Sequence, residues 1–203
     1  MRDRYRNHVR AAVLESAHDL IVERGWERVR MGEIAESVGI SRALLYKEFK
    51  DKAGLAEAVV LREAARFIDG IEEVLAHHNE DAAQGIGAAV NFTLEEASRS
   101  PLLRAVLISN RDPSTEPATG MLPLLTTSSQ LLDLATESLS GWVTTNFPDL
   151  DADEVVDAAD LLVRLTVSHL ALPKWTLAET SRKITEVALR YLGLRTTCAI
   201  GDA

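Results

Sequence analysis

The segment IAESVGISRALLYKEF, residues 34–49, has two short helical patterns on either side of a glycine. Apolar residues recur three or four positions apart before Gly39 and again after Ser41, which is the spacing of helices with one buried face. Glycine adopts the backbone angles of a sharp turn without steric cost, and serine is a preferred cap at the start of a helix. The segment therefore predicts a helix that ends at Gly39 and a second helix that runs from Ser41 to about Phe49.

Long polar side chains in the second of these helices suggest that DNA is its partner. Two helices joined by a tight turn with a glycine form a helix-turn-helix, in which the first turns of the second helix reach base edges in the major groove. An arginine there can bridge the two acceptors of guanine, and a tyrosine hydroxyl or a lysine can reach a phosphate. The residues in position for such contacts are Ser41, Arg42, Ala43, Tyr46, Lys47 and Lys52.

Less specific interpretations of these residues exist. Helices joined at a glycine are also found in helical proteins of other kinds. Tyr46 could be a partly buried core aromatic, and Arg42 could be an ordinary surface arginine. The order of the residues favours DNA binding, because the apolar positions of the segment form one helical face and the polar positions form the other.

Charge is distributed unevenly along the 203 residues. Residues 1–52 contain eleven Lys/Arg and nine Asp/Glu, a net charge of +2, whereas the rest contains 22 − 11 = 11 basic and 31 − 9 = 22 acidic residues, a net charge of −11. A small basic end on an acidic body is typical of a protein that presents that end to a polyanion, although a solvated basic face would have the same composition.

The overall composition is that of a globular protein with a substantial core, at 46% hydrophobic and 26% charged residues. The single cysteine, Cys198, excludes a disulfide framework and fits a reducing compartment. The N-terminus lacks the apolar core of a signal peptide, and no apolar run approaches the roughly 20 residues of a membrane span. We therefore expect a cytoplasmic protein with no membrane contact.

Helical periodicity also dominates the rest of the chain, and strand signals are nearly absent. A first helix should end at Gly25, and a fourth should begin after Asp51 and extend to about Leu75. Further helices are expected at about residues 81–99, 101–110, 120–146, 152–172 and 177–192, with the longest loop at 110–120. The fold class is therefore all-α.

The longer segment LIVERGWERVRMGEIAESVGISRALLYKEFKDKAGL, residues 20–55, resembles the DNA-binding end of the TetR family of transcriptional regulators. The resemblance implies about nine helices, with a three-helix helix-turn-helix DNA-binding domain in residues 1–52 and a helical ligand-binding and dimerisation domain in residues 53–203. It also implies a homodimer built mainly from the last two long helices. A repressor of this kind binds a palindromic operator in double-stranded DNA and is released by a small-molecule effector.

Three residues differ from the common pattern of that family. Arg30 stands where a threonine often caps the second helix, so the cap is lost or replaced by attraction between arginine and phosphate, and Arg30 joins the candidate DNA-binding residues. Leu44 replaces a threonine or small residue and removes a hydroxyl contact. Glu48 stands where histidine is frequent; it could read a cytosine, weaken affinity, or pair with Arg24 or Lys52, and we expect an intramolecular pair of this kind.

The N-terminal arm carries Arg2, Arg4 and Arg6. Basic N-terminal arms can enter the minor groove beside a helix-turn-helix. We expect a disordered, solvated tail here in preference to such an arm.

The effector site is less visible in the sequence. The aromatic and amphipathic candidates for ligand contact are Phe67, Phe92, Met121, Trp142, His169 and Trp175. Such residues are more often plain core. The resemblance implies a pocket that is apolar with a few polar groups, and hence an apolar or amphipathic ligand. The helices at 152–172 and 177–192 carry broad apolar faces that would serve either a dimer interface or the core of a monomer.

An enzyme is the least favoured class. His77 and His78 are adjacent, so on a helix they diverge and make a poor metal pair. No metal-binding spacing, phosphate loop or nucleophile elbow is present, and we expect neither catalysis nor a cofactor. The alternative function is a helix-turn-helix regulator that is controlled by a protein partner through its acidic body.

Overall fold

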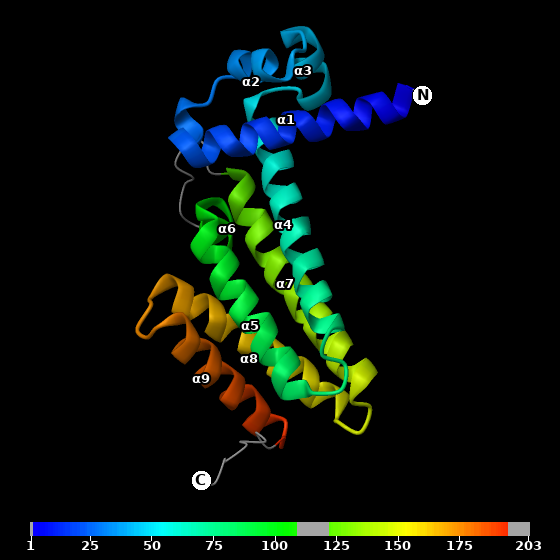
Figure 1. Cartoon of the computed structure of the whole chain (residues 1–203), viewed down its shortest axis with the longest axis vertical. Coiled ribbons are helices and arrows are strands. Elements are labelled where there is room, and N and C mark those ends of the chain that lie inside the picture. Colours follow the sequence, from blue (N-terminus) through cyan, green and yellow to red (C-terminus); the bar gives the residue numbers. More distant parts are fainter. Residues whose placement is uncertain (1, 109–121, 195–203) are drawn as a thin grey trace, which may run out of the picture. The chain divides into compact units, whose positions relative to one another are not determined.

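The computed structural model describes residues 2–108 and 122–194, which fold into helices (Figure 1). The α-helices are α1 (Arg2–Arg24), α2 (Met31–Val38), α3 (Arg42–Phe49), α4 (Lys52–Ala76), α5 (Ala82–Arg99), α6 (Pro101–Ile108), α7 (Leu122–Asn146), α8 (Ala152–Ala171) and α9 (Leu177–Tyr191), and a short 3-10 turn, η1 (Trp26–Arg28), follows α1. Nine α-helices without a strand in the described residues confirm the all-α fold class. The predicted loop at 110–120, Met121 and Cys198 lie outside the described residues.

The chain separates into two compact units. The first comprises Met1–Ala65 and Ser100–Ser128, and the second comprises Arg66–Arg99 and Ser129–Ala203. Helices α1, α2, α3 and α6 therefore belong to the first unit, α5, α8 and α9 belong to the second, and α4 and α7 contribute to both.

The corner between α2 and α3 has the turn that the sequence predicts. Gly39 has φ 70° and ψ 33°, in the left-handed region that glycine adopts at the lowest cost. The following N–H, that of Ile40, donates to the Ala35 carbonyl at 2.9 Å and so satisfies one of the last carbonyls of α2. The Ser41 hydroxyl oxygen accepts a hydrogen bond from the Leu44 N–H at 3.2 Å, which caps α3.

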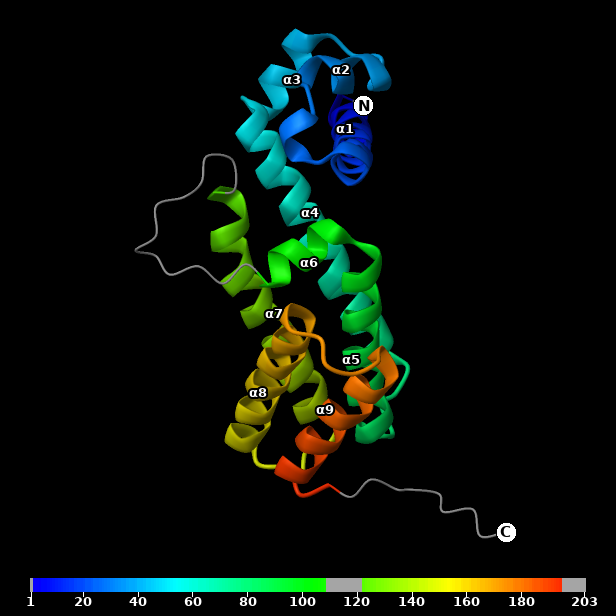
Figure 2. The same ribbon diagram turned by 90° about the vertical axis from the view of Figure 1, so that its left-hand side faces the viewer.

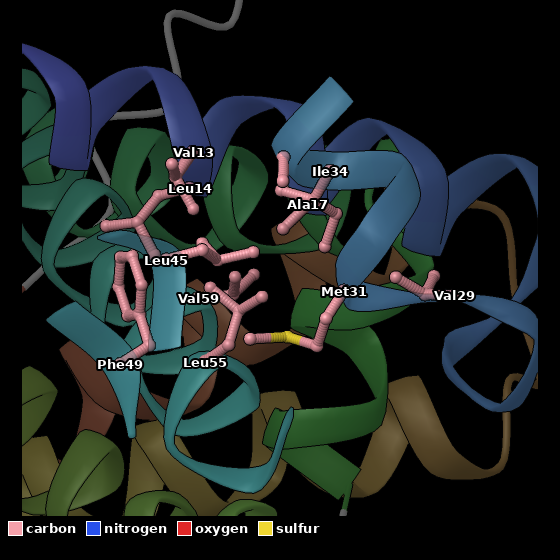
Figure 3. Close-up of a cluster of buried hydrophobic side chains, with 11 residues drawn as sticks. Val13, Leu14, Ala17, Val29, Met31, Ile34, Leu45, Phe49, Leu55 and Val59 are labelled. Carbon is pink, nitrogen blue, oxygen red and sulfur yellow. The ribbon is translucent and has the colours of Figure 1, made fainter. Parts of the chain in front are cut away.

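One apolar cluster holds α1, α2, α3 and the start of α4 together, and Leu45 of α3 lies in it with no exposed surface (Figure 3). The cluster consists of Val13, Leu14, Ala17, Val29, Met31, Ile34, Ala35, Leu45, Phe49, Leu55 and Val59. Full burial of a Val, Leu or Ile side chain stabilises a fold by about 1.5–3 kcal/mol. Helices as short as α2 and α3 are not stable in isolation. The cluster therefore determines which face of α3 is left outside.

The expectation of a disordered N-terminal tail is wrong, because α1 begins at Arg2, although Arg4 and Arg6 are exposed to solvent as expected. Val9 packs against the buried cluster and extends the apolar face of α1 toward its N-terminus. Arg6 and Arg10, one helical turn apart, both form ion pairs with Glu48 of α3. Contacts with another helix thus order this segment, and the sequence of the arm alone does not show them.

In the second unit, α9 packs against both α5 and α8 (Figure 2). The Ser181 hydroxyl of α9 donates to the Gly87 carbonyl of α5 at 3.2 Å. The Asp151 carboxylate caps α8, and Thr176 and Glu179 form a capping box at the start of α9. Hydrogen bonds from the Thr176 backbone N–H and hydroxyl lower the pKa of the Glu179 carboxyl.

The apolar faces of α8 and α9 serve mainly the core of this unit and not a free surface. Their buried members are Val155, Ala159, Leu162, Val163, Thr166, Leu170, Ile184 and Ala188. Five large apolar side chains of these helices remain exposed, Val156 at 50%, Leu161 at 48%, Leu177 at 43%, Val187 at 53% and Tyr191 at 46%. Any dimer contact through α8 and α9 therefore depends on the exposed side chains.

Candidate nucleic-acid interface

The outer face of α3 follows from the burial of its inner face. Leu45 and Phe49 are 0% and 4% exposed, so they fix the side of the helix that meets the protein. Residues two positions away in a helix point to nearly the opposite side. Ala43 and Lys47 are in those positions, and both are exposed. The outermost surface of α3 therefore combines a small side chain, which permits close approach, with a lysine.

Arg42 and Tyr46 are one turn apart and lie beside this outer surface. Tyr46 is 47% exposed, which places it outside the buried cluster. Arg42 is exposed as a residue, but its guanidinium lies against the first turn of α2. A Cβ at Gly32 would come within 2.7 Å of Arg42 Nη2, so the missing side chain at residue 32 leaves the space that the arginine occupies.

Lys52, in the first turn of α4, already has partners within the protein. Its Nζ lies 4.7 Å from the centroid of the Trp26 ring and donates to the Glu27 carbonyl at 3.3 Å. The side chain thus ties η1 to the start of α4. An ammonium group has three donors, so this position retains capacity for an anion.

Arg30 is exposed at the N-cap position of α2 and forms no side-chain cap hydrogen bond. The threonine-type cap is therefore absent, and the replacement of the cap by attraction between Arg30 and phosphate stays a prediction. The arginine stands at the helix end where free N–H groups favour negative charge.

Glu48 has intramolecular partners, as predicted, but the predicted residues are wrong. Its Oε1 accepts a hydrogen bond from Arg10 Nη1 at 3.2 Å, and its Oε2 lies 3.6 Å from Arg6 Nε. Arg24 pairs instead with acidic residues on α1 and α2, and Lys52 with η1.

Arg10 is the functional candidate that reasoning from the sequence missed. Its guanidinium carbon lies 4.8 Å from the centroid of the Phe49 ring, in addition to its bond with Glu48. The available signal was the spacing of four between Arg6 and Arg10, which puts both on one face if the arm is helical.

The candidate ligand-contact residues fall into three separate sets. Phe67 and Phe92 stack with ring centroids 6.0 Å apart, and His169 and Trp175 stack at 5.2 Å. The third set is Trp142, whose Nε1–H donates to the Asn79 side chain at 3.0 Å, whereas Met121 lies outside the described residues. Among the described residues, no ring contact joins one of these sets to another.

Two spaces in the second unit are of different kinds. A cavity of about 10 Å³ between α5, α7, α8 and α9 has only apolar residues in its walls. An open groove of about 630 Å³ between α5 and α9 is lined in part by Asp81, Gln84, Asn91 and Arg182. None of the candidate ligand-contact residues within the described part of the chain lines either space.

No group of three or more His, Cys, Asp or Glu side chains in residues 2–108 and 122–194 is arranged to hold a metal ion. Within those ranges, no helix has the length and apolar character needed to cross a membrane.

Comparison with known families gives two matches along the chain. Residues 13–59 match the family described as bacterial regulatory proteins, tetR family, and residues 81–190 match that described as bacterial tetracyclin repressor, C-terminal domain. The second match alone spans more than half of the chain.

Individual relatives agree with these matches. The HTH-type transcriptional regulator AlkX of Mycobacterium tuberculosis is 28% identical over 193 residues, which cover 90% of this chain and 86% of that protein. The crystal structure of the TetR family repressor AlkX from Dietzia sp., implicated in biodegradation of n-alkanes, is 28% identical with a TM-score of 0.65, over 90% of this chain and 96% of that one. FadR from Bacillus subtilis, solved with stearoyl-CoA, shares the fold at 18% identity and a TM-score of 0.56, over 88% and 96% of the two chains.

Proposed function

This chain belongs to the TetR family of transcriptional regulators, and we propose that it is a repressor released from a palindromic operator by a small apolar or amphipathic ligand. The observation that carries the proposal is the α2–α3 corner at Gly39, with the inner face of α3 buried and its outer face exposed. The repressor role is supported by the Dietzia relative, which is similar along almost the whole chain and is described as a repressor. We retain residues 1–52 as the proposed DNA-binding domain and residues 53–203 as the proposed ligand-binding and dimerisation domain.

The first turn of α3 is the part that we assign to base edges, because side chains from the start of such a helix reach furthest into the major groove. Ser41 and Arg42 supply polar contacts there, and Ala43 permits close approach to a thymine methyl group. Contacts with phosphate are assigned to Arg30, Tyr46, Lys47 and Lys52, of which Lys47 also reaches toward the bases.

A palindromic operator requires two copies of α3, about 34–36 Å apart, at successive major grooves. The exposed apolar side chains of α8 and α9 support a dimer interface on these helices. They are Val156, Leu161, Leu177, Val187 and Tyr191. Exposed apolar side chains that gather in one patch are typical of surfaces that meet another protein.

Light scattering is expected to give about twice the 22.2 kDa chain mass at micromolar concentration. Val187→Glu should shift the mass toward the monomer, because an unpaired carboxylate is costly to bury in an interface. Leu61→Glu, which places the same charge at an exposed apolar position of α4, is the matched control and should remain dimeric. A monomeric wild-type protein, or a Val187→Glu protein of unchanged mass, would contradict the dimer proposal.

The proposed ligand class rests on the apolar interior of the second unit and on the n-alkane context of the Dietzia relative. The apolar cavity of about 10 Å³ is far smaller than an organic ligand. A ligand that enters this apolar space must therefore separate the helices around it, and it stabilises a conformation other than the one in the structure. Such differential binding is what a population shift between DNA-bound and released states requires.

Selection of bound DNA from a pool of genomic upstream fragments tests the proposal. We expect enrichment of a palindrome with half-sites one helical turn apart, bound with strong salt dependence. Addition of a long-chain alkane or fatty acid should release this DNA, whereas a sugar phosphate should not. Failure to enrich any fragment at low salt would overturn the proposed function.

A further inference from the structure

Helix α3 contains one acidic residue, Glu48. In the proposed function this helix faces the phosphates of DNA. A carboxylate in this position would ordinarily repel the partner. Its location on the helix shows why it does not face outward. Leu44 and Glu48, one turn apart, line a cavity of about 60 Å³ whose opposite wall includes Tyr5, Arg6 and Val9 of α1. This flank of α3 is therefore fitted to the N-terminal part of α1.

Two arginines cover the carboxylate. The side chain of Glu48 is 16% exposed, while those of Arg6 and Arg10 are 69% and 41% exposed. Arg10 is held a second time, over the Phe49 ring. The formal charges of Glu48, Arg6 and Arg10 sum to +1, and the negative charge is less exposed than the two positive charges. Charge-assisted contacts of this kind restrain both long side chains on the flank of α3.

We propose that Glu48 is a specificity-determining residue, which acts by restraining Arg6 and Arg10 and so limits the attraction of the first unit for DNA of any sequence. The inference rests on the proposed DNA binding. Nonspecific affinity depends on how many phosphates the protein neutralises. An arginine that is free to move can reach phosphates in any register of the protein on the duplex. An arginine that is restrained by Glu48 can contact only those phosphates that lie near its fixed position.

The restraint by Glu48 lowers the affinity for operator DNA less than it lowers the affinity for other DNA. At the operator, base contacts from α3 fix the position of the protein, so released arginines meet only the few phosphates near the arm. On other sequences the protein can shift until released arginines find the best phosphates. Restraint by Glu48 therefore raises the ratio of specific to nonspecific affinity.

Glu48→Gln tests the inference, because it retains the size of the side chain and one oxygen acceptor but removes the charge. Affinity should be measured for the selected operator and for a scrambled duplex of the same length, across a range of salt concentrations. For the scrambled duplex we expect about tenfold tighter binding at low salt, and a slope of log affinity against log salt that is steeper by about 1.8, for two additional phosphate contacts. The specificity ratio should fall by several-fold.

Two further variants separate this role from general effects of charge. Glu36→Gln makes the same charge change at an exposed position of α2 and should leave the salt slope close to that of the wild type. In the Arg6→Gln background only one arginine can be released, so the added slope from Glu48→Gln should fall to about 0.9. Arg6 is suitable because its side chain is largely exposed, and thermal unfolding confirms that each variant is folded.

A wild-type protein that binds no DNA overturns the proposed function and this inference with it. If the wild type binds its operator but Glu48→Gln matches Glu36→Gln in slope and ratio, the inference alone is overturned. It is also overturned if Glu48→Gln weakens both duplexes equally at an unchanged slope, since that result indicates a structural brace only. A steeper slope that is halved in the Arg6→Gln background supports it.

Discussion

Replacement of Leu45 by alanine is expected to lower the free energy of unfolding of the first unit by about 2–5 kcal/mol. The side chain has no exposed surface and lies in the cluster that joins four helices (Figure 3). Its loss removes apolar contacts and leaves a cavity that helices fixed by several other contacts cannot fill. Denaturant unfolding followed by circular dichroism measures the change, and loss of operator binding should accompany it because α3 depends on the cluster for its orientation.

Leu61→Ala is the matched control for this prediction. Leu61 is 47% exposed on α4, so the same deletion should change the unfolding free energy by less than about 0.5 kcal/mol. If the two variants have the same free energy of unfolding, the buried cluster is not what stabilises the helix-turn-helix.

The helices were predictable because their signals are local. Apolar spacing marks the buried face of each helix, and residues such as Gly39, Ser41 and Asp51 terminate or cap helices through their own backbone or side-chain chemistry. The outer face of α3 could be predicted for the same reason, since a buried Leu45 and Phe49 determine by geometry which residues are exposed.

Features that depend on a second helix were not predictable. The order of the N-terminal arm and the partners of Glu48 arise from one contact between α1 and α3, and neither segment shows it alone. The contacts between aromatic residues of the second unit were not predictable for the same reason. Phe67 packs with Phe92, and His169 packs with Trp175, and each pair joins different segments of the chain. Apolar faces of α8 and α9 could not be divided between core and surface until their packing was known.

Arg42→Ala is expected to reduce discrimination between the operator and a duplex with one changed base pair. A bidentate contact between arginine and guanine contributes about 1–3 kcal/mol of discrimination, so the preference should fall by about 5- to 150-fold at the position that Arg42 reads. Affinity for unrelated sequences should change much less. Competition binding with a set of singly substituted operators at fixed salt measures both quantities and identifies the base pair.

Arg30→Ala and Tyr46→Phe separate base reading from phosphate contact. Arg30→Ala removes the same charge and should weaken all sequences alike, with a salt slope smaller by about 0.9. Tyr46→Phe removes only a hydroxyl and should weaken all sequences at an unchanged slope, because no charge is lost. In the described state the Arg42 guanidinium lies against Gly32, so it must leave the start of α2 to reach a base. If Arg42→Ala instead behaves like Arg30→Ala, then Arg42 contacts phosphate from its place beside Gly32, and another residue of α3 reads the bases.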